Sequence, residues 1–347
     1  MNEISNHRIS IIIPHYNNKN ILYNCINSLD KLSYQDYKII VVDNNSTDNS
    51  PAEVKKSFPN IDIIKSNQNL GYAGGCNLGA QSSKSEFLLF LNNDTIHNHD
   101  FIEPLVNLLD KDDSIASVQP KIINFDKINF DYAGGSGGFM DYLVYPFARG
   151  RIFNTVEKDE GQYNDVKQIF WASGACFLTR KSVFKNIGGF DATLFAHMEE
   201  IDFHWRSYMS GLDVYVEPNS VIYHKGGATL NQNSSQKIYL NHRNSLILLL
   251  TNYSISLSLY LLPIKLILEI ISSLKELLTF RIMNFINHYL AILWIVFNFN
   301  VIISRRRKNK KIRNQSDKEI FNKEIILSKS IVRLYFLLGR KKYSDLK

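Results

Sequence analysis

The chain has 347 residues and a mass of 40.0 kDa, 45% of its residues are hydrophobic, and its formal net charge is +7. A chain of this length and apolar content can bury a large core, which excludes a mainly disordered protein. Residues 304–347 hold 15 Lys and Arg against 4 Asp and Glu, so they carry 15 − 4 = +11 and the rest of the chain carries 7 − 11 = −4. The sequence therefore predicts an acidic body with a basic tail.

The cysteines and the N-terminal segment both indicate a cytoplasmic body. Cys25, Cys76 and Cys176 lie far apart and form no CxxC pair, which argues against a zinc site or a disulfide framework. The apolar run at residues 9–13 ends at Pro14, which makes it too short for the apolar core of a secretory signal. We expect reduced cysteines.

The first hundred residues alternate between short apolar runs and amphipathic segments. The runs at residues 9–13, 39–42, 61–64 and 87–91 are continuously apolar, as buried parallel strands are. Residues 20–32 have apolar side chains at helical spacing. This alternation predicts an α/β sheet with right-handed crossovers. In such sheets, ligands bind beyond the carboxyl ends of the strands.

Three of the predicted strands end in polar residues. Residues 14–18 follow the first strand, residues 43–48 follow the second, and Asn92, Asn93 and Asp94 follow the run at 87–91. Asp and Asn at such places also cap helices and turns without any further function. Because the three strand ends meet at one edge of the sheet, we predict a nucleotide and metal site there.

A glycine-rich run, NLGYAGGCNLG, occupies residues 69–79 and leads into a helix predicted at about residues 73–82. Glycine permits close approach of the backbone, and helix N-termini favour anions. The run matches neither the P-loop nor the GxGxxG spacing. Residue types alone leave two interpretations open: phosphate binding, or a tight turn followed by a helix packed through its glycines.

Candidate residues also occur in the second half of the body. WASGAC at residues 171–176 precedes an apolar strand, and Glu199, Glu200 and Asp202 open an amphipathic helix. Three clustered carboxylates are costly unless they serve a cation, a proton transfer or the helix dipole. Strands predicted at residues 214–216 and 221–224 end at His224. A histidine there could be a metal ligand or an ordinary core or surface residue.

The order of these motifs resembles that of family-2 glycosyltransferases with the GT-A fold. In chain order the motifs are ISIIIPHYNN, VVDNNSTDNS, NLGYAGGCNLG, LFLNND, WASGAC, GGFD, EEID and VIYHKGG. The NLG-aromatic-AGG run resembles the rhamnosyltransferase-like branch of the family. The resemblance covers roughly residues 9–245 and implies an α/β, Rossmann-like nucleotide-diphospho-sugar transferase domain, followed by apolar C-terminal helices.

The resemblance implies roles for individual residues. Asp43 would bind the base or ribose of the nucleotide, and Pro14, His15 and Tyr16 would line that pocket. Further donor-binding candidates lie in the glycine-rich run and after the fourth strand: Asn69, Gly71, Gly74, Asn77, Asn92 and Asn93.

The resemblance also implies an acceptor pocket. Trp171, Gly174 and Ala175 would line the acceptor or donor-sugar pocket. Trp171 could equally be a plain core residue.

The resemblance further implies a cation and a base. Asp94 resembles the last acid of the family's DxD motif, whose first acid is Asn92 here, and His224 matches a late metal-binding histidine. Mn²⁺ or Mg²⁺ suits such ligands. Glu199 and Glu200 match an acidic ED motif whose second residue is the catalytic base. We therefore expect Glu200 to be the base. Because Glu200 stands where the family usually has Asp, Asp202 is the next candidate.

After residue 245 the sequence becomes strongly apolar. Residues 246–262 carry no formal charge, and residues 282–303 contain no Lys, Arg, Asp or Glu. The second run is long enough to span a bilayer. Both runs contain polar residues, so they are equally suited to interfacial helices or a packed hairpin. The basic tail favours the cytoplasmic side, so we expect either no span or two, and we favour helices that lie in the interface of the cell membrane.

We therefore expect three regions: a GT-A domain at residues 1–245, apolar membrane-associated helices at 246–303 and a basic cytoplasmic tail at 304–347. The predicted function is inverting transfer of a sugar, rhamnose from dTDP-rhamnose in the first place, to a lipid-linked saccharide acceptor in bacterial surface polysaccharide assembly. One alternative is a UDP-sugar donor.

Another alternative is a scaffold that binds nucleotide sugars without turnover, because the DxD motif has lost an acid. The expected partners are the donor, the acceptor and a membrane surface. We do not expect nucleic acid, because no aromatic interleaving accompanies the basic tail. No feature of the sequence indicates an oligomeric state.

Overall fold

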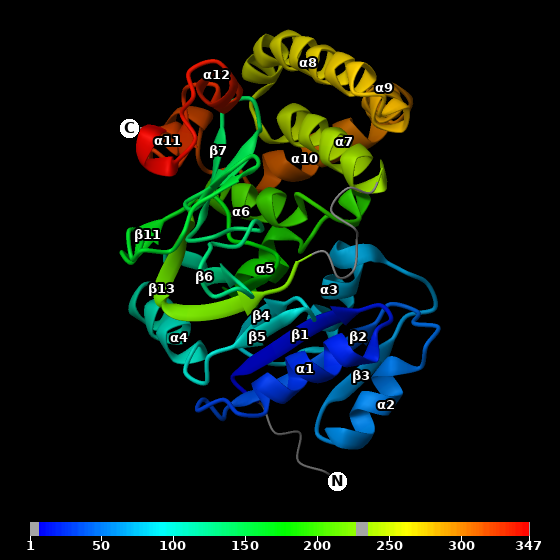
Figure 1. Ribbon diagram of the computed structural model, residues 1–347, viewed down its shortest axis with the longest axis vertical. Helices are drawn as coiled ribbons and strands as arrows, with labels where there is room; N and C mark the ends of the chain where they lie inside the picture. The colour runs from blue at the N-terminus through cyan, green and yellow to red at the C-terminus, as the bar shows by residue number, and fades with distance from the viewer. Residues whose placement is uncertain (1–6, 227–234, 347) are drawn as a thin grey trace.

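The computed structural model describes residues 7–226 and 235–346, and Figure 1 shows the arrangement of its elements. The chain begins with alternating strands and helices, and all four strands predicted in this part are present. The elements are β1 (Ile9–His15), α1 (Lys19–Leu29), β2 (Tyr37–Asp43), α2 (Ser50–Ser57), β3 (Asp62–Lys65), α3 (Gly71–Ser82) and β4 (Phe87–Leu91). Strands β4, β1, β2 and β3 lie side by side in this order and pair in parallel.

The large sheet continues beyond β4 with elements from the middle of the chain. These are β5 (Thr95–His97), α4 (Ile102–Lys111), β6 (Ile115–Asn124), β11 (Lys167–Gln168), β12 (Cys176–Arg180), α5 (Lys181–Ile187), the short helix η1 (Ala192–Leu194), α6 (Glu199–Met209) and β13 (Asp213–His224). Its strand order is β11-β13-β6-β12-β4-β1-β2-β3, and β5 pairs with β13. The two strands predicted at 214–216 and 221–224 are one strand, β13, whose pairing shifts between Glu217 and Val221. Pro218 lies in this break and has no N–H to donate to a ladder.

Alternating side chains of the strands build a core on each face of this sheet. In β1, Ile11 and Ile13 belong to the cluster that includes Leu22 of α1 and Leu105 of α4. Ile12 belongs to the opposite cluster, which includes side chains of α3, α5 and α6. The continuous apolar runs thus form strands that are buried on both faces. The three cysteines are buried and free of disulfides.

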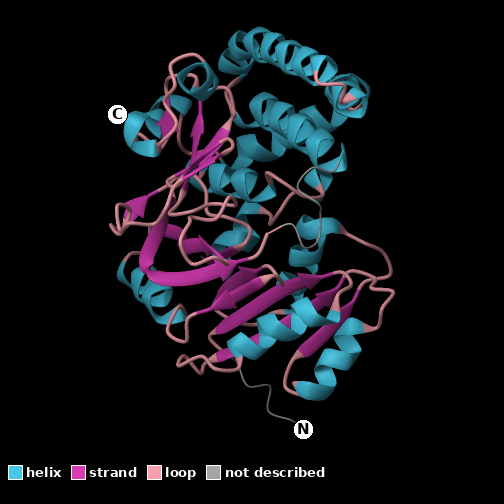
Figure 2. Cartoon of the chain, in the orientation of Figure 1, coloured by secondary structure: helices cyan, strands magenta, loops and turns pink. Residues whose placement is uncertain are grey.

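A second, smaller sheet connects the middle of the chain to its end. Its strands are β7 (Gly138–Asp141), β8 (Pro146–Ala148), β9 (Arg151–Ile152), β10 (Thr155–Val156) and β14 (Ile326–Leu327), and their order is β10-β9-β8-β7-β14. Strand β14 pairs in parallel with β7. The chain end also forms α11 (Asp317–Phe321), α12 (Ile331–Phe336) and the short helix η2 (Tyr343–Leu346). Figure 2 shows this small sheet above the large sheet and beside the helical layer.

The apolar region forms a layer of four helices over the body. These are α7 (Ser235–Asn252), α8 (Ile255–Leu278), α9 (Ile282–Phe297) and α10 (Phe299–Ile312). Figure 1 shows α8 and α9 as the outermost helices, with α7 between them and the body. Pro263 lies inside α8, and the apolar run at 282–303 is divided between α9 and α10, which meet at a bend of 70°.

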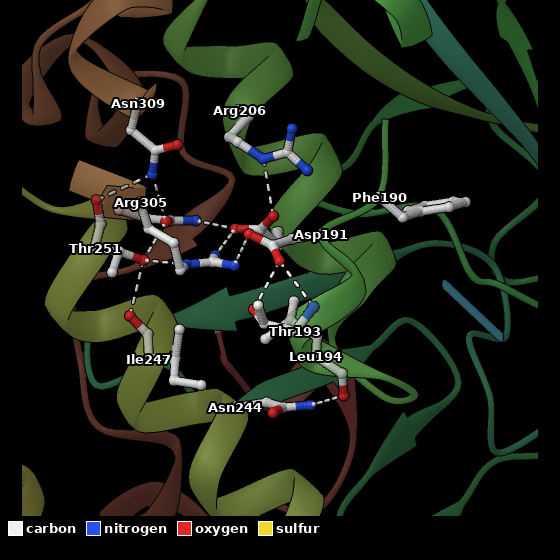
Figure 3. Close-up of polar contacts among 12 residues, drawn as sticks. Phe190, Asp191, Thr193, Leu194, Arg206, Asn244, Ile247, Thr251, Arg305 and Asn309 are labelled. Carbon is white, nitrogen blue, oxygen red and sulfur yellow. Dashed lines mark hydrogen bonds and ion pairs between the residues drawn. The ribbon is translucent and has the colours of Figure 1, made fainter. Parts of the chain in front are cut away.

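The expected basic tail is connected to the body rather than separate from it. Arg305 of α10 is 4% exposed, and it forms ion pairs with Asp191 and with Asp202, where Nη2 and Oδ1 are 2.7 Å apart. Figure 3 shows Arg305 pointing toward Asp191 beside Thr251 and Asn309. The boundaries that we expected at residues 245 and 303 fall inside α7 and α10. Helix α7 packs into the core of the body, and α10 supplies this buried cation, so neither position separates two regions of the structure.

Candidate functional site

A pocket of about 1140 Å³ opens where the carboxyl ends of the parallel strands meet the helical layer. It contains most of the residues that we predicted for the site. Those that line it are Pro14, His15, Tyr16, Asn69, Gly71, Asn92, Asn93, Asp94, Trp171, Gly174, Ala175, Glu199, Glu200 and His224. Elements far apart in the sequence thus converge at one edge of the sheet, as the topology of open α/β sheets requires.

Three of the predicted donor-binding residues do not line the pocket. Asp43 ends β2 and accepts a hydrogen bond from the Ser46 N–H at 2.7 Å, which shapes the following loop. Gly74 packs against Leu70. The Asn77 side chain bonds to both backbone groups of Phe190, at 2.8 and 3.0 Å, and so fastens α3 to the loop before α6.

The glycine-rich run combines the two interpretations that its residue types left open. Helix α3 begins at Gly71, which lines the pocket and has a φ of 67°. A side chain at this position would collide with Phe195, so glycine is required by both the backbone conformation and the close approach. Gly79 lies about two helical turns further along α3, and it packs directly against Ile12. The first part of the run therefore shapes the pocket, and the second part packs the helix on the sheet.

His15 holds the strand ends together. Its Nδ1 accepts a hydrogen bond from the Asn93 amide at 2.8 Å, so its Nε2 carries the proton and donates to Ser50 Oγ at 2.8 Å. Burial lowers the pKa of His15 to about 4, although Asp48 and Asp43 act in the opposite direction. The neutral imidazole thereby fixes the side chain of Asn93 in the pocket wall.

Asp94 and His224 lie together in the pocket, and Asp131 lies behind them. His224 Nε2 is 3.1 Å from Asp94 Oδ1, and His224 Nδ1 is 2.9 Å from Asp131 Oδ1. Burial lowers the pKa of His224, but the charges and hydrogen bonds of the two carboxylates outweigh it and raise the pKa to about 10. Sequence reasoning did not select Asp131 as a site residue. Its motif, DYAGG, was the signal that could have identified it.

The pair of Asp94 and His224 fits a divalent cation. A carboxylate oxygen and an imidazole nitrogen are 3.1 Å apart on the wall of a pocket, and Mn²⁺ accepts both kinds of donor. Asp131 on the second nitrogen would orient the imidazole, as partner groups of metal-binding histidines do. Metal binding requires the neutral imidazole, so an ion would displace the proton that the two carboxylates favour.

Glu199 and Glu200 open α6 inside the pocket. Oε2 of each carboxylate accepts no hydrogen bond from any residue in the described ranges. Burial raises the pKa of Glu200 to about 7, and burial together with the charge of Glu200 raises that of Glu199 as well. The helix N-terminus favours negative charge, but burial is the larger effect. A carboxylate with a pKa near neutrality and a free oxygen suits a general base.

The backbone just before α6 adopts an uncommon conformation. Phe195, His197 and Met198 have φ values of 64°, 68° and 69°. Such left-handed residues cost free energy and persist where the surrounding structure imposes them, often at functional sites. The turn places Glu199 and Glu200 at the pocket.

Asp202, the second candidate for the base, lies outside the pocket. It is completely buried, and its carboxylate is bonded to Arg206 at 2.8 Å, to Arg305 at 2.7 Å and to the Asn252 amide at 3.0 Å. Two residues along a helix correspond to a rotation of about 200°, so Asp202 faces away from Glu200. Both oxygens are occupied by cations and an amide, which excludes Asp202 as the base in this arrangement.

The predicted acceptor residues lie next to Glu200, and a tyrosine joins them. Trp171 donates from Nε1 to the Phe139 carbonyl at 2.8 Å and is 6% exposed, so it is mainly a core residue with an edge in the pocket. The Gly174 carbonyl accepts a hydrogen bond from the Tyr72 hydroxyl at 2.6 Å. Tyr72 comes from the glycine-rich run, where we considered only the glycines and asparagines.

The far end of the pocket is basic and apolar, which the sequence did not reveal. Its cationic residues come from β9, α7, α8 and α12, and its apolar residues come from α8 and the segment around α12. They are Arg151, Lys237, Lys265, Lys275 and Arg333, together with Leu268, Ile271, Val332, Phe336 and Leu337. The pocket thus runs from the strand ends to the apolar helices.

Comparisons with known proteins agree with this fold. The family described as Glycosyl transferase family 2 matches residues 10–188. An N-acetylglucosaminyl-diphospho-decaprenol L-rhamnosyltransferase of Mycobacterium tuberculosis is 25% identical over 243 residues, which cover 65% of this chain and 79% of the relative. The low-salt glycan biosynthesis hexosyltransferase Agl10 of Haloferax volcanii is 25% identical over 68% of this chain and 73% of its own length.

Solved structures show the same architecture at lower identity. GalNAc-T7, solved with UDP, GalNAc and Mn²⁺, is similar with a TM-score of 0.54 at 17% identity, over 70% of this chain and 48% of that one. TarS of S. aureus is similar with a TM-score of 0.51 at 17% identity, over 74% of this chain and 42% of that one. The fold is therefore of the GT-A type, and because the family match spans more than half of the sequence, the chain belongs to glycosyl transferase family 2.

Proposed function

We propose that this glycosyltransferase transfers a sugar from a nucleoside diphosphate to a lipid-linked saccharide with inversion at the anomeric carbon. The observation that carries the proposal is the placement of Glu200. Its carboxylate has a free oxygen and a pKa raised to about 7, and it lines the same pocket as Asp94 and His224.

The reaction is a single displacement in which Glu200 is the base. The acceptor hydroxyl attacks the anomeric carbon, its proton passes to Glu200, and the bond from that carbon to the diphosphate oxygen breaks. Asp94 and His224 would hold Mn²⁺ or Mg²⁺, which supplies positive charge for the departing diphosphate. Asn93, fixed by His15, and the N-terminus of α3 at Gly71 lie where they can bind the donor.

The relatives support rhamnose as the first donor to test. The mycobacterial relative is named for rhamnosyl transfer to a lipid-linked diphospho-N-acetylglucosamine, and the chain covers most of its length. A UDP-sugar is the second candidate, because similar structures were solved with UDP. The scaffold alternative does not explain why a partly buried Glu200 keeps an unbonded oxygen in the pocket.

The helical layer supports attachment to a membrane. The side chains of α8 that face inward are Ser258, Leu261, Lys265, Glu269 and Ser273, whereas the exposed ones include Ile267, Ile271, Leu274 and Leu278. This is the reverse of a helix on the surface of a soluble protein, whose apolar face turns inward. An apolar outer face of this size indicates a lipid or protein contact, and we propose the membrane interface.

The geometry of the layer favours an interfacial position over two spans. Within residues 7–226 and 235–346, α8 is the one single helix long and apolar enough to cross a bilayer, and the bent pair of α9 and α10 passes the same test only together. The inward polar face of α8 packs against the body and α9 instead of facing lipid. Arg307, Lys308, Lys310 and Lys311 near the end of α10 are exposed and would attract an anionic leaflet.

The pocket connects this apolar face with the proposed base. Leu268 and Ile271 of α8, and Phe336 and Leu337 of the α12 region, line its far end, and three of these four side chains are more than 45% exposed. A lipid-linked acceptor could therefore place its sugar near Glu200 while its lipid stays at the apolar rim. Arg151 and Lys275 along the wall suit the charge of a diphosphate link.

The test is transfer by the purified full chain in lipid nanodiscs. The donors would be dTDP-rhamnose and a set of UDP-sugars, and the acceptor a polyprenyl-diphospho-N-acetylglucosamine. We expect a glycosylated lipid whose anomeric configuration, determined by NMR, is opposite to that of the donor. Retention of configuration would refute the single displacement, and absence of both transfer and donor hydrolysis with every donor would refute the function.

A further inference from the structure

Two histidines and a glutamate meet where α7, α8 and α9 pack together. His242 Nδ1 lies 2.7 Å from Glu269 Oε2, and His288 Nδ1 lies 2.8 Å from the same oxygen. The centroids of the two imidazole rings are 3.8 Å apart. Each residue comes from a different helix, so the convergence results from tertiary packing and not from local helical spacing.

Two of the three side chains are buried in apolar surroundings. The Glu269 and His288 side chains are 1% and 2% exposed, in helices that are otherwise among the most apolar of the chain. Burying a carboxylate costs free energy unless the group is paired or coordinates a metal. In the absence of an ion, both imidazoles must offer their protons to a single oxygen and place their rings in contact.

The second oxygen of Glu269 has a different neighbour. Lys265 Nζ lies 3.5 Å from Glu269 Oε1 and 3.5 Å from the centroid of the Tyr145 ring. Lys265 therefore pairs with the oxygen that the histidines do not use. A ligating carboxylate is commonly held in this way by a partner on its other oxygen.

We propose that His242, Glu269 and His288 bind a divalent transition metal ion, with zinc as the first candidate. Two imidazole nitrogens and one carboxylate oxygen are a known three-residue donor set for zinc, and the three donor atoms lie within 4.8 Å of one another. His242 is 23% exposed and lines the pocket, so the fourth position would open toward the pocket for water or an anionic group.

This site is distinct from the pair of Asp94 and His224. It shares no residue with that pair, and its ligands belong to the helical layer instead of the sheet edge. An ion here would fasten α8 and α9 to α7, the helix that packs into the body. The inference is independent of the proposed function.

The test is metal binding by the untagged full chain in detergent. After removal of metal and dialysis against zinc, we expect about one zinc per chain by mass spectrometry of the metal content. With Co²⁺ we expect visible absorption bands of a tetrahedral ion. His242→Gln, whose side chain is partly exposed and therefore easier to replace, should bind zinc at least about tenfold more weakly, and so should His288→Gln.

Asp94→Ala is the matched control, because it removes the carboxylate of the other site. It should bind zinc as the wild type does and give the same cobalt spectrum. If the wild type retains no zinc, or if His242→Gln binds it equally well while circular dichroism shows it folded, the cluster is only an ionic contact between helices and the proposal is wrong. If Asp94→Ala loses the zinc, the ion belongs to the sheet edge and the proposal is also wrong.

Discussion

At the scale of single residues, the environment of Glu200 determines its chemistry. Oε2 of Glu200 accepts no hydrogen bond from the described residues, and an amide has nearly the shape of a carboxylate, so Glu200→Gln removes the proposed base with little change in packing. We expect Glu200→Gln to lower kcat by about 10²- to 10⁴-fold with little change in donor affinity. Steady-state kinetics and calorimetric titration with the donor nucleotide would measure the two effects. Wild-type turnover by this variant would contradict our choice of base.

The raised pKa of Glu200 predicts a pH dependence with a definite sign. Burial raises this pKa to about 7 from an ordinary value of about 4.5, and only the deprotonated carboxylate can accept the proton of the acceptor. The value of kcat/KM should therefore rise with pH and level off above an inflection near pH 7. The profile would be measured from pH 5 to 9 at saturating Mn²⁺. A profile that is already level from about pH 6 upward would mean that the acting carboxylate does not have the raised pKa of Glu200.

Asp131 acts through His224, which makes it a positioning residue. It holds His224 Nδ1 at 2.9 Å and does not line the pocket. Asp131→Asn should weaken the binding of Mn²⁺ by about 10- to 100-fold and leave kcat at saturating Mn²⁺ much less affected. Electron paramagnetic resonance of free Mn²⁺ in the presence of donor nucleotide would give the affinity. Unchanged affinity would show that His224 does not depend on this carboxylate.

Most of the residues that the sequence predicted for the site line the pocket, and the exceptions have physical reasons. Glu199 and Glu200 were selected because three carboxylates within four residues are costly to cluster and because the pair matches an acidic motif of the family. Asp202 could not be assigned correctly, because its partner Arg305 is 103 residues away and no local pattern reveals a distant ion pair. Gly74 and Asn77 belong to the right motif but do not line the pocket, because Gly74 lies against Leu70 and the Asn77 side chain is bonded to Phe190.

At the scale of elements, the buried ion pairs of Arg305 connect α10 to α6 and to the loop before it. Removal of this guanidinium would leave Asp202 with one cation fewer and Asp191 without its buried partner. We expect Arg305→Ala to lower the free energy of unfolding by about 3 to 5 kcal/mol. Urea denaturation in detergent would measure the change. Arg307→Ala, on the exposed side of the same helix, is the control and should change stability by less than about 0.5 kcal/mol.

The elements differ in how far the sequence could predict them. The strands of the large sheet were predictable, because burial on both faces makes each strand a continuous apolar run. The end of the chain was not predictable, because the return of β14 to β7 depends on a parallel pairing of two-residue length. The charge of residues 304–347 suggested a solvated tail, although one of its arginines is a core cation and Arg313 donates to the carbonyl of Asn252 at the end of α7.

At the scale of the whole molecule, the two ends of the pocket lie in different environments. One end is built from strand ends and binds a water-soluble donor in our proposal, while the other is bordered by the exposed apolar side chains of α8 and the α12 region. This arrangement suits an enzyme that works at a lipid surface. Truncation is a poor test of that idea, because α7 belongs to the core and β14 completes the small sheet.

Surface substitutions on the outer helices test membrane binding without removing any element. Leu278 and Phe297 are 79% and 80% exposed, so Asp at both positions should leave the fold intact. Burial of a leucine or phenylalanine side chain is worth roughly 1.5 to 3 kcal/mol. The double variant should therefore bind anionic vesicles at least about 100-fold more weakly in a flotation assay, while donor binding stays unchanged.

Val166→Asp is the matched control for this variant. Val166 is 46% exposed and lies next to β11, which Figure 1 shows far from α8 and α9. Its replacement should leave vesicle binding as it is, because that part of the surface would face water. Added salt should weaken the remaining binding of the double variant, since Arg307, Lys308, Lys310 and Lys311 would still attract anionic lipid. If the double variant floats with vesicles as well as the wild type does, the outer face of α8 and α9 does not contact lipid.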